Sequence, residues 1–297
     1  MISQILLAID RSKQALKAQQ VAGKLGSSLS AEVEVLHIHE TPLTASVYDA
    51  ETLRRENVET SMEASTLVRR AVAALRDRGI PASGTVRPSR GSTVREIVAA
   101  AREGRADLLV MGALGVSRWR ELLVGGVAHA AVQLAPCPVL IVPQGGKAGD
   151  LRRLVVGVDG STGAARAAEL TCELAHRLGA AVLVVHASDG SLAEQEPDTI
   201  AADAAGAIGP DRVAAVRVRA AGKGGVASAL QAEAADYDAD LLVVGRRGRS
   251  TLQRLLLGGV SERLLHIAPC PLLVAHPPGR SEIEDPPATQ RATTTVQ

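Results

Sequence analysis

The chain contains the same block of sequence twice, and this repeat restricts the possible folds more than any other feature. The block ADLLVMGALGVSRWRELLVGGVAHAAVQLAPCPVLIVP (106–143) aligns with ADLLVVGRRGRSTLQRLLLGGVSERLLHIAPCPLLVAHP (239–277), and no gap is needed from Ala106 to Val142. Upstream, the segments ILLAIDRS and LVVGVDGS also correspond, which aligns Asp10 with Asp159. A chance match with four glycines and an APCP motif in register is very improbable. The sequence therefore predicts two copies of one domain in tandem.

A length of 297 residues also agrees with two domains of about 150 residues each. We assign the first domain to residues 1–143 and the second to residues 152–277. The glycine-containing stretch PQGGKAGD opens the linker, which we place at 144–151. The tail 278–297 is rich in Pro, Thr and acidic residues, and we expect it to be disordered.

Runs of Val and Leu alternate with amphipathic segments in both halves, which predicts an α/β fold. Nearly continuous apolar strands between helices are typical of a parallel sheet that is covered on both faces. We expect two tandem doubly wound domains, each with a five-stranded parallel sheet in the order 3-2-1-4-5. The expected strands are 2–9, 31–38, a short one near 85, 107–112 and 138–142, then 154–158, 181–186, 213–218, 241–245 and 272–275.

Special residues gather where such a sheet binds ligands. In a doubly wound sheet, ligands bind beyond the carboxyl ends of the strands where the strand order reverses, here between strands one and four. Asp10 and Asp159 end the first strands, and a G-x2-G-x9-G-G loop follows each fourth strand. Glycine permits a positive φ and close approach of a ligand, and the last glycine pair opens a helix whose N–H groups suit phosphate. These glycines are Gly112, Gly115, Gly125 and Gly126, then Gly245, Gly248, Gly258 and Gly259.

Each of these residues also has a plain structural interpretation. A glycine pair is commonly a turn or a packing site, and Asp10 can cap the following helix instead of contacting ribose or a metal ion. The loop arginines can screen phosphate charge or simply be solvated. His37 and His186, at the ends of the second strands, are interpreted as hydrogen-bonded and partly buried. The arginines concerned are Arg118, Arg120, Arg246, Arg247, Arg249 and Arg254.

The sequence gives little support for catalysis. Cys137 and Cys270 begin the fifth strands, where small buried thiols are usual, and with Cys172 they show no zinc-ligand spacing. No Ser/His/Asp or Cys/His set recurs between the halves. No GxGxxG follows the first strand, which disfavours a Rossmann dehydrogenase. We therefore expect no enzyme, no catalytic residue and no metal site.

Charge and hydropathy exclude two classes of partner. The net charge is +1, so no overall field favours nucleic acid. No apolar run approaches the roughly 18 residues of a membrane span, and the apolar N-terminal segment is too short for a signal peptide. We expect a reduced, cytoplasmic protein that binds neither nucleic acid nor membrane.

The glycine loop, the strand-one Asp-x-Ser and the APCP strand together resemble the universal stress protein family. The resemblance covers residues 1–143 and 152–277. In ATP-binding members, the strand-one aspartate and its neighbours lie beside the nucleoside, strand two contacts the base, and the glycine loop holds ribose and phosphates. The resemblance thus implies an ATP site, with or without Mg²⁺, in each half. Its residues would be Ala8, Ile9, Asp10, Ile38, Met111, Gly112, Gly115, Gly125, Gly126 and Val127, then Gly157, Val158, Asp159, Ala187, Val244, Gly245, Arg246, Gly248, Gly258, Gly259 and Val260.

One departure from the family pattern weakens this implication. The usual Ser or Thr after the third glycine is replaced by Gly126 and Gly259, so a phosphate-binding hydroxyl is missing twice. Three functions stay open: an ATP-binding stress-response regulator without efficient turnover, an interaction scaffold that binds no nucleotide, and a slow ATPase. The first agrees best with recurring glycines and no recurring catalytic base.

Two further expectations concern the relation between the halves. The fifth strands are aliphatic edges that would invite association if left open, so we expect them to pair and form an intramolecular pseudo-dimer. A homodimer in addition stays open, and no protein partner is identified. Because the second loop carries Arg246, Arg247 and Arg249, we expect it to bind a triphosphate more tightly than the first.

Overall fold

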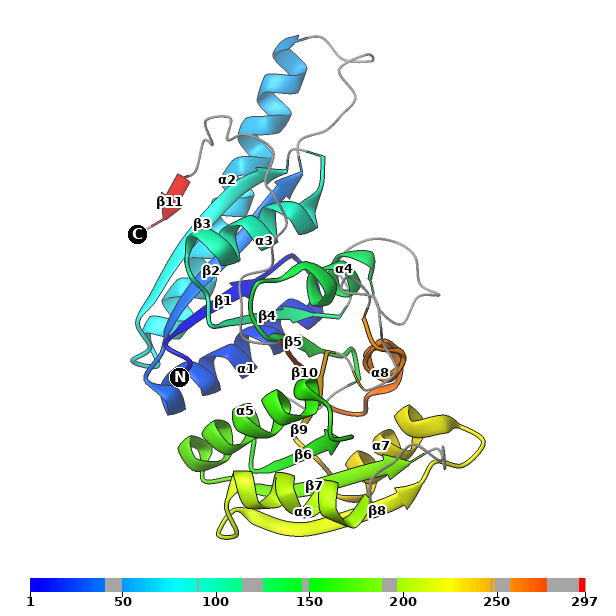
Figure 1. Cartoon of the computed structure of the whole chain (residues 1–297). Helices are drawn as coiled ribbons and strands as arrows, with labels where there is room; N and C mark the ends of the chain where they lie inside the picture. The colour runs from blue at the N-terminus through cyan, green and yellow to red at the C-terminus, as the bar shows by residue number, and fades with distance from the viewer. Residues whose placement is uncertain are drawn as a thin grey trace.

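The computed structural model describes residues 1–40, 50–89, 91–113, 125–145, 150–188, 197–246, 248, 257–276 and 294–296. Strands and helices alternate along both halves, as expected (Figure 1). The first half consists of β1 (Gln4–Ala8), α1 (Lys13–Leu29), β2 (Glu32–Glu40), α2 (Ala50–Arg76), β3 (Ala82–Ser89), α3 (Thr93–Glu103), β4 (Leu108–Gly112), α4 (Gly126–Leu134) and β5 (Val139–Val142). The second half consists of β6 (Arg153–Val158), α5 (Thr162–Leu178), β7 (Ala181–Ser188), α6 (Pro197–Ile208), β8 (Val213–Ala220), α7 (Gly225–Asp236), β9 (Leu241–Gly245), α8 (Gly259–Ile267) and β10 (Leu272–Ala275).

With β11 (Thr294–Val296), the described strands form one sheet in the order β11-β3-β2-β1-β4-β5-β10-β9-β6-β7-β8. Within each half the pairing is parallel and the order is 3-2-1-4-5, which confirms the predicted topology. In the second half, β6 pairs with both β7 and β9 in the same way. The strand order therefore reverses between β1 and β4 and again between β6 and β9, where the ligand sites are expected.

The helices cover both faces of the sheet and bury alternate strand residues on each side. In β1, Ile5 and Leu7 join a core that contains residues of α1, α2, α5 and α6. Leu6 and Ala8 join a core on the opposite face that contains residues of α3, α4, α7 and α8. Each core runs through both halves, so the two domains share their hydrophobic interior. Among the described residues, no helix is long and apolar enough to cross a membrane.

The two halves meet at an antiparallel seam between β5 and β10. Leu273 pairs with Leu140, and Leu272 pairs with Ile141, and all of these side chains are buried. This pairing removes two aliphatic sheet edges and confirms the predicted pseudo-dimer. Because the seam is antiparallel, the strands of the second half run opposite to those of the first. The carboxyl ends of the strands in the two halves therefore lie at opposite edges of the sheet.

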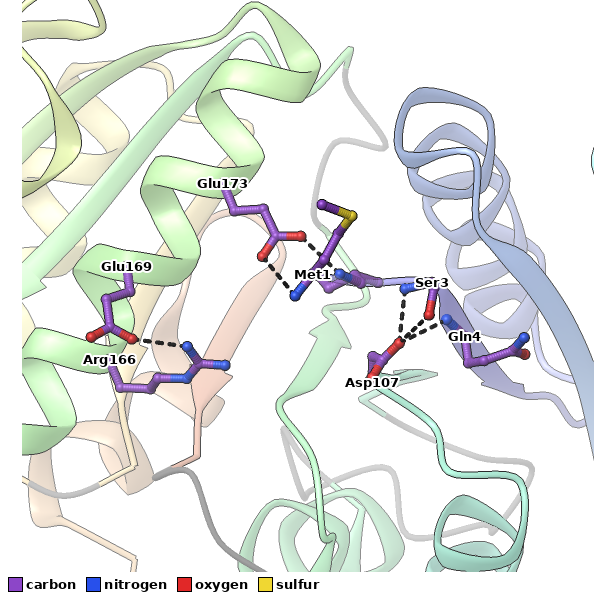
Figure 2. Close-up of polar contacts among 8 residues, drawn as sticks. Met1, Ser3, Gln4, Asp107, Arg166, Glu169 and Glu173 are labelled. Carbon is purple, nitrogen blue, oxygen red and sulfur yellow. Dashed lines mark hydrogen bonds and ion pairs between the residues drawn. The ribbon is translucent and has the colours of Figure 1, made fainter.

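Further contacts across the seam involve the N-terminal segment (Figure 2). Glu173 of α5 accepts a hydrogen bond of 2.7 Å from the Ile2 amide and lies 3.6 Å from the N-terminal ammonium. On the other side of this segment, Asp107 accepts hydrogen bonds from the Ser3 amide, the Ser3 hydroxyl and the Gln4 amide. The start of β1 is thus fixed both to the second half and to the strand beside it.

The linker and the tail differ in part from expectation. Leu151, which the sequence places in the linker, is fully buried in the shared core, and Asp150 forms an ion pair with Lys24. In the tail, where we expected disorder, Thr294–Val296 form β11, which pairs antiparallel with β3. These three residues have the high strand propensity of Thr and Val, and β3 offers an unpaired edge. Residues 277–293 and 297 lie outside the described residues.

Candidate functional site

The Asp-x-Ser motif forms the same turn in both halves. The Asp10 carboxylate accepts a hydrogen bond of 2.9 Å from the Ser12 amide, and Ser12 Oγ caps α1 by accepting from the Ala15 amide. In the second half, Asp159 accepts from the Ser161 amide at 3.0 Å and Ser161 caps α5. The serine is therefore the N-cap residue of each helix. The aspartate, two residues earlier, stabilises the turn by accepting a hydrogen bond from the serine amide. This arrangement places each aspartate at the carboxyl end of the first strand.

A cavity of about 570 Å³ opens at the switch point of the first half, between the ends of β1 and β4. This volume lies within the usual range of about 300–1,000 Å³ for small-molecule sites. Nine of the predicted site residues line it: Ala8, Ile9, Asp10, Ile38, Met111, Gly112, Gly125, Gly126 and Val127. Gly115 lies outside the described residues.

The cavity combines an apolar floor with polar groups near β2. Leu36, Ile97 and Met111 are buried apolar residues of its lining. His37 Nδ1 lies 2.8 Å from the Ile9 carbonyl oxygen, so this nitrogen donates to that oxygen. Burial lowers the pKa of His39, and the neighbouring His37 and Arg11 lower it further. At neutral pH the cavity wall therefore presents uncharged His39 rather than an imidazolium.

The amino end of α4 lies at the cavity and carries no side-chain cap. Gly125 is the N-cap residue, its amide donates to the Ala113 carbonyl at 2.7 Å, and Gly126 begins the helix. The first-turn N–H groups of a helix have no intrahelical acceptor and attract anions. A Cβ added at Gly126 would meet no atom of the described residues within 4 Å. The space for a side chain, or for a ligand, therefore exists at this position.

The glycines that end β4 and β9 have a packing role that the sequence did not reveal. A Cβ at Gly112 would lie 2.8 Å from the Gln14 Cβ, at the start of α1. A Cβ at Gly245 would lie 2.4 Å from the Gly163 carbonyl carbon, at the start of α5. We assigned the close approach at these two glycines to a ligand. At both positions it is instead the first helix of that half that approaches the fourth strand. Gly112 lines the cavity as well, so the two roles coincide there.

The predicted residues of the second half also meet at one place, but more tightly. A Cβ at Gly248 would lie 2.4 Å from Asp159 Oδ2, so this loop approaches the aspartate directly. A Cβ at Gly157 would lie 3.0 Å from the Leu230 side chain, whereas Ala8 is accommodated at the equivalent position. His186, the equivalent of His37, is fully buried, with Nδ1 2.9 Å from the Val158 carbonyl oxygen. The remaining predicted residues come from the ends of β7 and β9 and the start of α8: Ala187, Val244, Gly258, Gly259 and Val260.

Arg246 does not lie in the second cradle as we expected. Its guanidinium crosses the seam and donates a hydrogen bond of 3.0 Å to the Gln133 carbonyl, at the carboxyl end of α4. The reason is that the second-half strands end at the same edge of the sheet where α4 ends. The expectation of tighter triphosphate binding by the second half thus loses one of its three arginines. The other loop arginines, Arg118, Arg120, Arg247, Arg249 and Arg254, lie outside the described residues.

The cysteines are placed as the sequence indicated. Cys137 and Cys270 are buried at the starts of β5 and β10, and burial, with a smaller effect of Asp107 or Asp240, raises the pKa of each thiol to about 12. Both are protonated at neutral pH, which makes them unreactive core residues. In the described residues, no group of three His, Cys, Asp or Glu side chains is arranged to hold a metal ion.

Comparison with known sequences decides the family. The sequence profile of the Universal stress protein family matches residues 1–143 and again residues 150–276. The chain belongs to the universal stress protein family. The double match agrees with the tandem organisation inferred from the repeat.

Individual universal stress proteins support this membership. One from Bacillus subtilis is 32% identical over 149 residues, which cover 48% of this chain and 99% of that protein. One from Mycobacterium tuberculosis is 30% identical over 195 residues, which cover 57% of this chain and 61% of that protein. The crystal structure of a universal stress protein from Archaeoglobus fulgidus matches 95% of this chain and 97% of its own, with a TM-score of 0.69 at 22% identity. That structural likeness concerns the fold.

Several lining residues of this universal stress protein site were not predicted. Those from β2, α2 and α3 bring most of the polar groups, and those from α1 and α4 are small: Arg11, Ala15, Leu36, His37, His39, Thr60, Thr93, Ile97, Ala113 and Ala128. His37 was noticed because it recurs as His186, and that recurrence was the available signal. Thr60 and Thr93 occur in ordinary helical segments, and nothing in their spacing marks them.

Proposed function

We propose that the cavity of the first half binds an adenine nucleotide, ATP with or without Mg²⁺, and that the chain is a nucleotide-dependent stress-response regulator. The observation that carries this proposal is the coincidence of three groups at one cavity. An apolar floor, the braced carboxylate of Asp10 and the uncapped amino end of α4 all line the same space of about 570 Å³. Family membership supports the stress-response role.

Each part of a nucleotide has a chemical counterpart in this lining. The apolar floor suits a purine ring, which gains from leaving water. A carboxylate such as Asp10 accepts hydrogen bonds from ribose hydroxyls. The first-turn N–H groups of α4 donate to phosphate, and the helix dipole favours the negative charge. The missing serine at Gly126 removes one hydroxyl donor but leaves these N–H groups in place.

The second half is proposed to bind the same ligand more weakly. Its strand-one aspartate contacts the loop at Gly248, and Leu230 takes the space beside Gly157. Arg246, the described arginine of that loop, is directed to α4 instead. Each of these features reduces either the room or the positive charge that a triphosphate needs.

A matched pair of substitutions in each half tests this assignment in the full chain. Gly126→Asp adds a carboxylate at the first position of α4, where the backbone has room for it and where acidic residues favour a helix start. We expect calorimetry to show ATP binding at least about tenfold weaker, because like charges near a protein surface repel by about 1–4 kcal/mol. Gly126→Asn is the neutral control of the same shape. Gly259→Asp and Gly259→Asn repeat the pair in the second half and should change total binding less.

Two outcomes would reject the proposal. Equal ATP affinity of the Gly126→Asp and Gly126→Asn proteins would place the phosphates elsewhere. No ATP binding by the unsubstituted chain would favour the scaffold hypothesis.

Binding without efficient turnover is the second part of the proposal. One oxygen of the Asp10 carboxylate already accepts from the Ser12 amide, which leaves it poorly suited as a general base. We expect no phosphate release above the spontaneous rate over hours with saturating ATP and Mg²⁺. Release that is lost in Asp10→Asn would instead establish the slow ATPase.

A further inference from the structure

Helix α4, an element of the first half, contacts the second half as well. Its amino end, at Gly126 and Val127, lines the cavity of the first half. Its carboxyl end lies against the second half, because the antiparallel seam brings the ends of β9 and β10 to that edge of the sheet. A helix of this length spans about 13 Å and moves as a rigid rod. Any shift of the carboxyl end therefore also shifts the amino end at the cavity.

Two second-half side chains satisfy the last carbonyls of α4. The final carbonyls of a helix have no intrahelical donor and carry its negative pole. Arg246 Nη1 donates to the Gln133 carbonyl at 3.0 Å, and His276 Nε2 lies 2.9 Å from the Val132 carbonyl oxygen, to which it donates. Helix α4 has no basic residue in its own last turn, so the donors to these carbonyls come from the other half. We call Arg246 and His276 the α4 clamp.

At the two aligned positions, the clamp has no counterpart in the opposite direction. The first-half residues aligned with Arg246 and His276 are Ala113 and Pro143, which carry no donor that could reach α8. Helix α8 instead has its own basic residue, His266, in its last turn, where α4 has Gln133. A third contact, the 3.5 Å approach of His129 to Glu262, joins the two helices near their middles. The sequence repeat is therefore broken at the positions that connect the halves.

We infer that Arg246 and His276 are positioning residues for the ligand site of the first half, on which they act through α4. This inference rests on the proposed function, since it concerns the same cavity. The clamp fixes where the N–H groups of α4 point, so it affects the phosphate end of the ligand and not the base end. Arg246 directly follows Gly245, a predicted residue of the second cradle, so the clamp links the two predicted sites through α4. Coupling between two binding sites is reciprocal, so a ligand in either half would affect the other.

The test measures ATP and adenosine binding by calorimetry for the full chain and for Arg246→Ala. Alanine stands at the equivalent position, Ala113, so the fold accommodates it. We expect ATP to bind about two- to thirtyfold more weakly, a range typical of residues that couple two sites. Adenosine, which has no phosphate, should change by less than twofold. Arg246→Lys should retain part of the ATP affinity, and His276→Gln, a second variant, should lower it in the same direction.

Hydrogen exchange on the ligand-free proteins gives an independent measurement. We expect the amides of α4 to exchange faster in Arg246→Ala than in the unsubstituted chain. Arg263→Met is the matched control, because it removes an exposed arginine of the same half, on α8, and should change neither exchange nor affinity. Unchanged ATP affinity of Arg246→Ala, or equal weakening of ATP and adenosine, overturns the inference and leaves the proposed function standing. Absence of ATP binding by the unsubstituted chain overturns both the inference and the proposed function. Unchanged hydrogen exchange of the α4 amides in Arg246→Ala would show that Arg246 does not hold the carboxyl end of α4.

Discussion

The two halves of the molecule share a backbone path but differ in the space at their switch points. In the first half, Ala8 and the neighbouring strand ends border an open cavity. In the second, Leu230 lies against Gly157, and Asp159 lies against Gly248. The repeat thus determines the fold of each half, whereas different side chains border the two switch points. The difference in ligand binding that we propose between the halves rests on these side chains.

The largest effect is expected where the halves do not differ, at the seam. Leu140→Pro or Leu273→Pro removes a buried side chain and an N–H of a central strand, and should cost at least about 3 kcal/mol of unfolding free energy. Because each core runs through both halves, either variant should lower a single unfolding transition seen by calorimetry. Leu140→Met is the volume-conserving control. Two separate transitions, with only one of them affected, would show that the halves are independent.

The second prediction compares the glycines that end β4 and β9. In Gly112→Ala the new Cβ lies 2.8 Å from Gln14 Cβ, whereas in Gly245→Ala it lies 2.4 Å from the Gly163 carbonyl carbon, so α5 must shift further than α1. We expect Gly245→Ala to destabilise the protein by about 1–3 kcal/mol, as overpacking usually does, and Gly112→Ala to cost less. Chemical denaturation measures both. An equal or reversed ranking would mean that α1 and α5 approach the sheet in the same way.

Restoring the hydroxyl that is absent at Gly126 should have a smaller effect, and it should strengthen ATP binding instead of weakening the protein. Gly126→Ser adds one donor at the amino end of α4, and a net hydrogen bond of about 0.5–1.5 kcal/mol corresponds to roughly two- to tenfold tighter ATP binding. Adenosine should gain almost nothing. Gly259→Ser should improve binding less, since we propose that the second half binds ATP more weakly. If the two serine variants behave alike, or if adenosine gains equally, the phosphates do not lie at these helices.

The smallest expected change in the free energy of unfolding concerns the aspartates that precede β4 and β9. Partial burial would raise the pKa of Asp107, but hydrogen bonds from Ser3 and Gln4 outweigh it and hold the pKa below the usual 3.8. A lowered pKa in the folded state means stabilisation that is complete above 3.8 and lost as the pH falls through the folded-state value. Asp107→Asn should therefore lower the free energy of unfolding at pH 7 by less than about 1 kcal/mol, because the site is partly exposed, and have less effect below pH 3.

Asp240 provides the comparison in the second half. It accepts hydrogen bonds of 2.8 and 2.9 Å from the Arg152 and Arg153 amides and is more buried than Asp107. Asp240→Asn should therefore cost more than Asp107→Asn at pH 7. A pH-independent loss in the Asp107→Asn protein would show that the carboxylate charge plays no part.

The sequence predicted the strand order and much of the site because both follow from local patterns. Apolar strands and their spacing define a doubly wound sheet, and its topology then brings Asp10 and Gly126 to one cavity. It could not predict that Gly112 and Gly245 serve helix packing, since a glycine looks the same beside a ligand and beside a backbone. The direction of Arg246 was also inaccessible, because it depends on the relative orientation of the halves. Side-chain packing across the seam, and not motif spacing, decides such details.

The seam between β5 and β10 has a consequence for synthesis on the ribosome. β5 is complete when residue 142 has been made, but its partner β10 follows only after about 130 further residues. At ordinary elongation rates this delay is on the order of ten seconds. During that time the first half exposes an aliphatic strand edge with no partner, next to other nascent chains on the same message. The two β5 edges of neighbouring chains could pair as β5 pairs with β10, so slow translation of the second half should favour intertwined dimers over monomers.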